Sequence, residues 1–109
     1  MSSANPFTPT GNTITFNATT SPVVGVQATS STLGSIQYLI QNSGSVVAFL
    51  GVGSSNTAAQ TNAAAVTTTQ PAIPLLPSSI QVLTFPANSF FSGNAASNCA
   101  IYITPGEGV

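Results

Sequence analysis

The 109-residue chain has almost no ionisable side chains. It contains no lysine, arginine or histidine, and its single acidic residue is Glu107. Soluble domains normally carry charge on about a quarter of their residues. Without basic side chains the protein cannot displace counterions from phosphate groups, so we expect no direct binding of nucleic acid. A net charge near zero instead favours association between protein surfaces.

The shortage of titratable groups also argues against catalysis. General acid–base chemistry needs a side chain that titrates near the working pH, and one carboxylate cannot supply the pair that glycoside hydrolysis uses. Metal sites need clusters of cysteine, histidine or acidic residues, which this composition does not provide. We therefore expect that the protein is not an enzyme and that it holds no metal ion and no cofactor.

Two features that can carry chemistry in other proteins are weak here. Cys99 has no histidine to activate it, and its place in an alternating pattern predicts a small buried core residue. A single cysteine cannot form an internal disulfide, which suits a reducing compartment. Gly51-Val52-Gly53 begins like a dinucleotide-binding motif, but Asn56 stands where the third glycine is needed. We interpret it as the exit from a strand.

Long apolar runs are absent too. A membrane span needs about 18 consecutive apolar residues, and the longest comparable run, Val46–Val52, is far shorter. The N-terminus has no basic start and no apolar stretch, so we expect no secretory signal and synthesis in a host cytoplasm. Because 42% of the residues are hydrophobic and few are charged, we expect the chain to fold, as one domain.

The most regular pattern present is the two-residue period of β-strands. It appears in residues 14–18, 36–40 and 99–103, and further strands are predicted at Val23–Ala28, Val46–Val52 and Ile80–Phe85. The turn residues Asn42–Ser45 predict a hairpin between the strands on either side of them. Residues 46–50 are apolar on both faces, so we expect that strand to be covered on both sides or to lie in an intersubunit contact.

The remaining segments have less regular compositions. Ser2–Gly11 contains two prolines and predicts an extended arm. Thr57–Gln70 includes a weak helical candidate, but we predict a loop, because threonine and asparagine disfavour a short unpacked helix. Pro71–Pro77 suits an edge strand or a crossover. Ser92–Asn94 predicts a turn, and Pro105–Val109 predicts a turn or a short tail.

About six to eight short strands without a convincing helix predict an all-β fold. We expect a single-domain β-sandwich, jelly-roll-like, over residues 12–109, preceded by an extended N-terminal arm over residues 1–11.

Three stretches of the chain carry a resemblance to a known family. They are the C-terminal segment Ile101–Val109, the segment Gln41–Ser55, and Ile73–Pro77 followed by Ile80–Ala87. These resemble, in turn, the ending, the central hairpin and the third block of small virion-associated proteins that tailed bacteriophages encode beside the major capsid gene. The chain departs from them in its longer segment Thr57–Gln70 and in its near-total lack of charge.

The resemblance implies a jelly-roll-like head decoration or cement protein. Such a protein sits on the outside of the virion, binds the major capsid protein, and stabilises contacts between neighbouring capsid subunits, often as a homo-oligomer (dimer or trimer). We expect no membrane partner. A clamp of this kind needs shape and apolar contact area rather than titratable groups, which agrees with the composition.

For a clamp, the sequence suggests a set of contact residues. Interface anchors are typically aromatic, and the C-terminal segment is one of the stretches that carry the resemblance. The candidates are Phe7, Phe90, Phe91, Thr104, Pro105, Glu107 and Val109. For the two adjacent phenylalanines, an ordinary core position is an equally good interpretation.

Two other functions remain open from the sequence. A head–tail or tail-fibre component of the same virion would also be rich in strands and poor in charge. A carbohydrate-binding β-sandwich could use asparagine and glutamine hydrogen bonds and a tyrosine platform, although the chain has no tryptophan and no cluster of calcium-binding acids.

Overall fold

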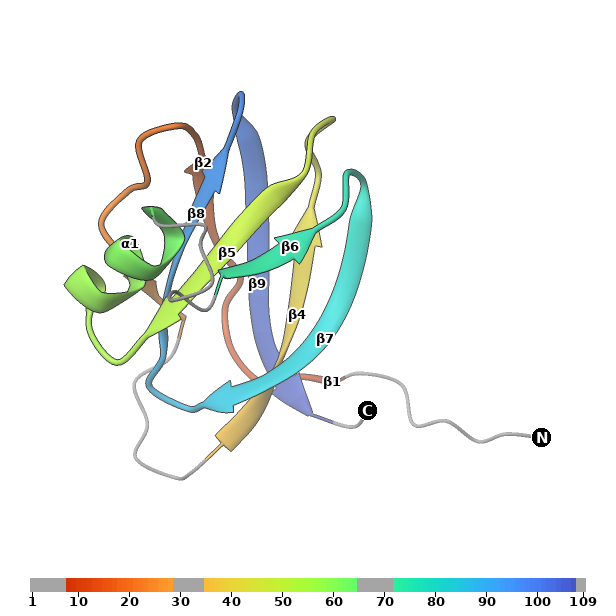
Figure 1. Ribbon diagram of the computed structural model, residues 1–109. Helices are drawn as coiled ribbons and strands as arrows, with labels where there is room; N and C mark the ends of the chain where they lie inside the picture. The colour runs from red at the N-terminus through yellow and green to blue at the C-terminus, as the bar shows by residue number, and fades with distance from the viewer. Residues whose placement is uncertain (1–7, 29–34, 65–71, 108–109) are drawn as a thin grey trace.

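The computed structural model describes residues 8–28, 35–64 and 72–107, which form two antiparallel sheets packed face to face (Figure 1). In sheet A, β1 (Thr8–Pro9) and β2 (Ile14–Ala18) lie along one side of β9 (Cys99–Glu107), followed by β4 (Ser35–Asn42) and β7 (Ser79–Pro86). Sheet B has the order β3 (Val26–Gln27), β8 (Phe90–Ala95), β5 (Ala48–Gly53) and β6 (Ala72–Leu75). The helix α1 (Asn56–Ala64) follows β5.

The strands pair in a nested order. β2 pairs with β9, β3 with β8, β4 with β7, and β5 with β6, so the first half of the chain folds back on the second half. A long hairpin rolled up in this way into two sheets is a jelly roll. The predicted all-β sandwich is therefore confirmed.

The core lies between the two sheets and follows the alternation of the sequence. The inward side chains of β2, β4 and β9 are buried, as predicted: Phe16, Ala18, Tyr38, Ile40, Cys99, Ile101 and Ile103. The Cys99 thiol donates to the carbonyl oxygen of Val46 at 3.4 Å. Its predicted role as a small core residue is confirmed.

The predicted hairpin between β4 and β5 is wrong. β4 pairs with β7 and β9 in sheet A, whereas β5 pairs with β6 and β8 in sheet B. The connection crosses from one sheet to the other and is held by the buried side chain of Asn42. Its Nδ2 donates to the carbonyl oxygens of Val46 and Leu75, both at 3.0 Å, and its Oδ1 accepts from the amide of Gly44 at 2.9 Å. Turn chemistry reverses the chain locally but does not decide which strands pair.

Two other predicted turns lie inside strands. Ser92–Asn94 belongs to β8, and its small residues mark close packing instead of a turn. A Cβ on Gly93 would lie 2.9 Å from the Cβ of Ala18, and the Ser92 hydroxyl donates to the carbonyl oxygen of Val23 at 2.6 Å. Likewise β9 continues to Glu107, so the predicted C-terminal turn or tail over residues 105–109 is wrong for its described part.

The loop predicted at residues 57–70 is also wrong for its described part, because Asn56–Ala64 is helical. The Ser55 hydroxyl accepts from the amide of Ala58 at 3.1 Å, which caps the N-terminus of α1. The helix packs on the outer face of β5, where a Cβ on Gly51 would contact the backbone of Ala59 and Ala63. This close approach buries both alanines and stabilises a helix whose intrinsic propensity is low.

The proline-rich segment is confirmed as an edge strand. Among the described strands β6 pairs with β5 alone, and Pro74 lies within β6, where a missing amide is tolerated. The inner face of β5 lies in the core, and α1 covers its outer face at Gly51 and Gly53. No helix in the described part of the chain is long and apolar enough to cross a membrane.

Part of the predicted N-terminal arm lies against the sandwich. Thr8 and Pro9 pair with Glu107 and Gly106, and the amide of Thr10 donates to the carbonyl oxygen of Pro105 at 2.9 Å. The predicted boundary between arm and domain at residues 11 and 12 stays a prediction.

Three aromatic rings join the sheets at one end of the core. Phe91 of sheet B packs edge-on against Tyr38 and Phe85 of sheet A, with ring centroids 4.9 Å and 5.9 Å apart. The Tyr38 hydroxyl lies 2.9 Å from the carbonyl oxygen of Ala87 and 3.1 Å from that of Pro86. Burial raises the pKa of Tyr38 above its ordinary value of 10.0.

This buried phenol predicts a loss of stability in alkali. Because the pKa of Tyr38 is raised, the folded state keeps the proton while the unfolded chain releases it, so the stabilising contribution is complete below pH 10 and falls as the pH rises further. We expect Tyr38→Phe to cost about 1–3 kcal/mol at pH 7, because the carbonyl groups lose their donor, and to flatten the decline above pH ~10. Denaturant unfolding at several pH values measures both effects. Tyr102→Phe, on an exposed ring, is the control, and an equal flattening there would contradict the assignment.

Candidate protein-interaction surface

The two outer faces of the sandwich differ. The outer face of sheet B carries α1, which packs on β5 and β8 (Figure 1). No helix within the described residues covers the outer face of sheet A. Within the described residues, the outer face of sheet A is therefore the sheet surface that no helix separates from a partner.

The strand registers define which side chains share this face. Tyr102 on β9 lies opposite Thr15 on β2 and Gln41 on β4, and Gln41 in turn lies opposite Ile80 on β7. The next row consists of Thr104, Leu39 and Val82. On β2, β4 and β9 these residues alternate with buried core residues, and on β7 they share the outward face through their pairing with β4, so they point away from the core. We call this set the sheet A face: Thr15, Leu39, Gln41, Ile80, Val82, Tyr102 and Thr104.

The sheet A face mixes apolar groups with neutral hydrogen-bonding groups. Tyr102 is 40% exposed and Ile80 is 59% exposed. The hydroxyls of Thr13 and Thr104 are 2.6 Å apart and hydrogen bond to each other. No residue of this face is charged. The face can contribute apolar contact area and hydrogen bonds, and ion pairs make no contribution to it.

The apolar character continues at one end of β7. Leu76, 60% exposed, lies in the turn between β6 and β7, and its carbonyl oxygen accepts from the Ser79 hydroxyl at 2.6 Å. Ser78 in this turn has a positive φ of 55°, a conformation that few residues other than glycine adopt. The turn therefore places the exposed side chain of Leu76 directly before β7, the last strand in the order of sheet A.

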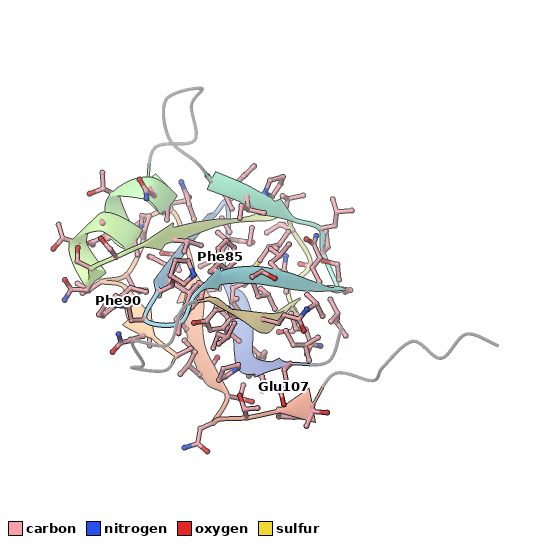
Figure 2. All side chains as sticks on the ribbon, turned by 90° about the horizontal axis from the view of Figure 1, so that it is seen from below. Phe85, Phe90 and Glu107 are labelled. Carbon is pink, nitrogen blue, oxygen red and sulfur yellow. The ribbon has the colours of Figure 1, made fainter. Side chains whose placement is uncertain are left out.

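The contact residues suggested by the sequence do not form one surface. Thr104 lies on the sheet A face, Glu107 is exposed at the end of β9, and Pro105 is buried. Phe90 is half-buried at the start of β8 in sheet B, beside α1, whereas Glu107 lies beside β1 (Figure 2). Phe7 and Val109 lie outside the described residues.

Phe91 occupies the core. It has no exposed surface and packs against two rings of the other sheet. Of the two interpretations that the sequence allowed for this residue, the structure supports the core position. Leu39, Val82 and Tyr102 are not among the residues suggested by the sequence, although they lie on the sheet A face. The sequence feature that could have identified them is an apolar residue at the outward-facing positions of a strand whose inward-facing positions are also apolar.

Comparisons of the chain with protein-family models, with curated proteins and with solved structures give no match.

Proposed function

We propose that the protein is a structural component of a bacteriophage virion, which binds the outer surface of the capsid and stabilises contacts between neighbouring capsid subunits. The observation that supports this most is the sheet A face, an open and uncharged strand surface with exposed apolar side chains. Its proposed partners are the major capsid protein and further copies of the chain. The sequence resemblance to head decoration proteins points to the same role.

The absence of charge predicts how attachment responds to salt. Dissolved ions weaken contacts between charged groups by screening them, and the sheet A face has no such groups. We expect the affinity of the chain for capsids of its own virus to change less than ~2-fold between low and high salt. Co-sedimentation with capsids stripped of the protein measures this. A steep loss of binding in salt would contradict attachment through a neutral face.

Matched substitutions locate the docking surface. Tyr102→Ser removes an exposed ring at the centre of the sheet A face, and we expect capsid affinity to fall at least ~10-fold. Val24→Ser is the control, because Val24 is also an apolar residue with high exposure, 55%. It lies beside α1 and not on the sheet A face, since the amide of the adjacent Gly25 donates to the carbonyl oxygen of Asn56 in α1. Equal effects of both substitutions would count against this face.

The number of copies per virion separates head attachment from a position in the tail. A protein that stabilises the capsid surface is present in hundreds of copies, and a head–tail or tail-fibre component in a few to dozens. Quantitative gel densitometry of purified virions decides between them, and a low copy number would overturn the proposal of a head decoration protein.

One observation favours a second candidate function. The exposed ring of Tyr102 has Thr15 and Gln41 directly opposite it on the neighbouring strands. An aromatic ring beside hydroxyl and amide groups can also stack on and hydrogen bond to a sugar. Binding to a panel of immobilised glycans, lost in Tyr102→Ser, would support a carbohydrate-binding module instead.

A further inference from the structure

The four edges of the two sheets differ in how well they are protected against pairing with another strand. In sheet B, β3 has two residues, and β6 has four residues, including Pro74. In sheet A, the edge formed by β1 and β2 is interrupted between Pro9 and Ile14. Short length, proline and interruption are the usual means by which proteins block such edges. Three edges are therefore protected.

The fourth edge, β7, has none of these protections. β7 spans eight residues, Ser79–Pro86, and its only proline is the last residue. It pairs with β4 on one side, and no strand of the described chain pairs with its other side. It also lacks the charged side chains that commonly keep edge strands apart. The backbone amides and carbonyls along this edge are available to a further strand.

We propose that the free edge of β7 pairs with β7 of a second copy of the chain, in antiparallel register about a twofold axis at Val82. The inference rests on the self-association that the proposed function includes, and it names the surface responsible. It would join two copies of sheet A into one continuous sheet, with both sheet A faces on the same side.

The composition of β7 favours a second copy as the partner. A twofold axis perpendicular to the sheet produces antiparallel pairing and places each residue opposite one that points to the same side. With Val82 on the axis, residues 79–85 pair with residues 85–79, and Pro86, which has no amide to donate, falls just outside. Ile80, an exposed apolar residue, then lies opposite Thr84 of the partner and is partly covered. No charge opposes the approach, because neither strand carries one.

The test is the oligomeric state of the purified full-length chain, measured by sedimentation over a range of concentrations. We expect a dimer. Val82→Lys should raise its dissociation constant at least ~10-fold, because two like charges would face each other at the axis. Asn17→Lys, at an exposed position on the opposite edge of sheet A, is the control and should leave the dimer unchanged. Circular dichroism confirms that both variants fold.

A second variant tests the register without adding charge. Val82→Cys should form an intermolecular disulfide under mild oxidation, since directly opposed side chains in antiparallel strands lie close enough. Asn17→Cys, on the opposite edge of sheet A, should stay uncrosslinked, and the native Cys99 is buried. A monomeric wild-type chain, or a dimer that Val82→Lys does not weaken, would overturn the inference.

Capsid attachment is measured separately, so the two proposals can fail independently. A monomer that attaches to capsids would overturn pairing through β7 and leave the proposed function in place. A dimer that depends on Val82 but does not attach to capsids would support the pairing and overturn the proposed function.

Discussion

Asn42→Asp is expected to destabilise the protein by about 3–5 kcal/mol at pH 7, the cost of an uncompensated buried charge. Asn42 is 0% exposed, and its amide nitrogen donates to the carbonyl oxygens of Val46 and Leu75. An aspartate would remove both donors and place a carboxylate against two carbonyl oxygens. The chain has no lysine, arginine or histidine to compensate that charge.

The loss should depend on pH with a definite sign. Burial and the neighbouring carbonyl oxygens would raise the pKa of the new carboxyl group in the folded state above its ordinary value of about 3.9. As the pH rises above ~4, the unfolded chain ionises first, so the destabilisation relative to wild type should grow with pH. Denaturant unfolding of both proteins at acidic and neutral pH measures this difference.

Asn17→Asp is the matched control, because Asn17 is exposed on β2. Its effect should stay within about 0.5 kcal/mol of wild type at pH 7. If the two substitutions proved equally mild, Asn42 would not hold the crossover between the sheets.

Gly51→Val is expected to cost about 1–3 kcal/mol, as an overpacked site does, and to displace α1. A Cβ at Gly51 would lie 2.5 Å from the carbonyl oxygen of Ala59 and in contact with the backbone of Ala63. Backbone atoms of a helix cannot rotate aside as a side chain can, so the whole helix must move. Ala59 and Ala63 would then lose their burial.

Hydrogen exchange distinguishes displacement of the helix from general loss of stability. In Gly51→Val, the amides of α1 should exchange much faster than in wild type, while those of β4 and β9 change little. Thr15→Val is the control, because it places the same side chain on a strand face that no described helix covers. Unchanged protection of α1 in Gly51→Val would show that the helix does not depend on this contact.

Asn42→Asp and Gly51→Val both act where a local sequence pattern gives the wrong prediction, a hairpin after β4 and a loop after β5. The alternation in β2, β4 and β9 predicts their buried faces correctly, because each strand has one side toward the core and the period of two is a local property. The helix at Asn56–Ala64 was missed because its stability comes from packing on Gly51, which lies in a different element. The crossover at Asn42 is predicted as a hairpin, because the same turn residues occur in hairpins within one sheet and in connections between two sheets.

The candidate surface was predictable only in part. Thr104 was suggested by the sequence and lies on the sheet A face. The adjacent Phe90 and Phe91 were suggested as well, but both belong to sheet B, and Phe91 is a core residue. Tyr102, Leu39 and Val82 become neighbours only through the pairing of β9 with β4 and of β4 with β7. Such pairing between strands distant in sequence cannot be inferred from the period of any one strand.

Composition and alternation along the chain are enough to indicate the chemical character of the protein and the class of its fold. A chain with one acidic and no basic side chain must use neutral contacts, and alternating short segments must form sheets. Which strands are neighbours, which face α1 covers, and which edge of the described sheets is unpaired depend instead on the three-dimensional fold. The physical reason is that alternation is set by local backbone geometry, whereas strand order depends on contacts between segments far apart in the chain.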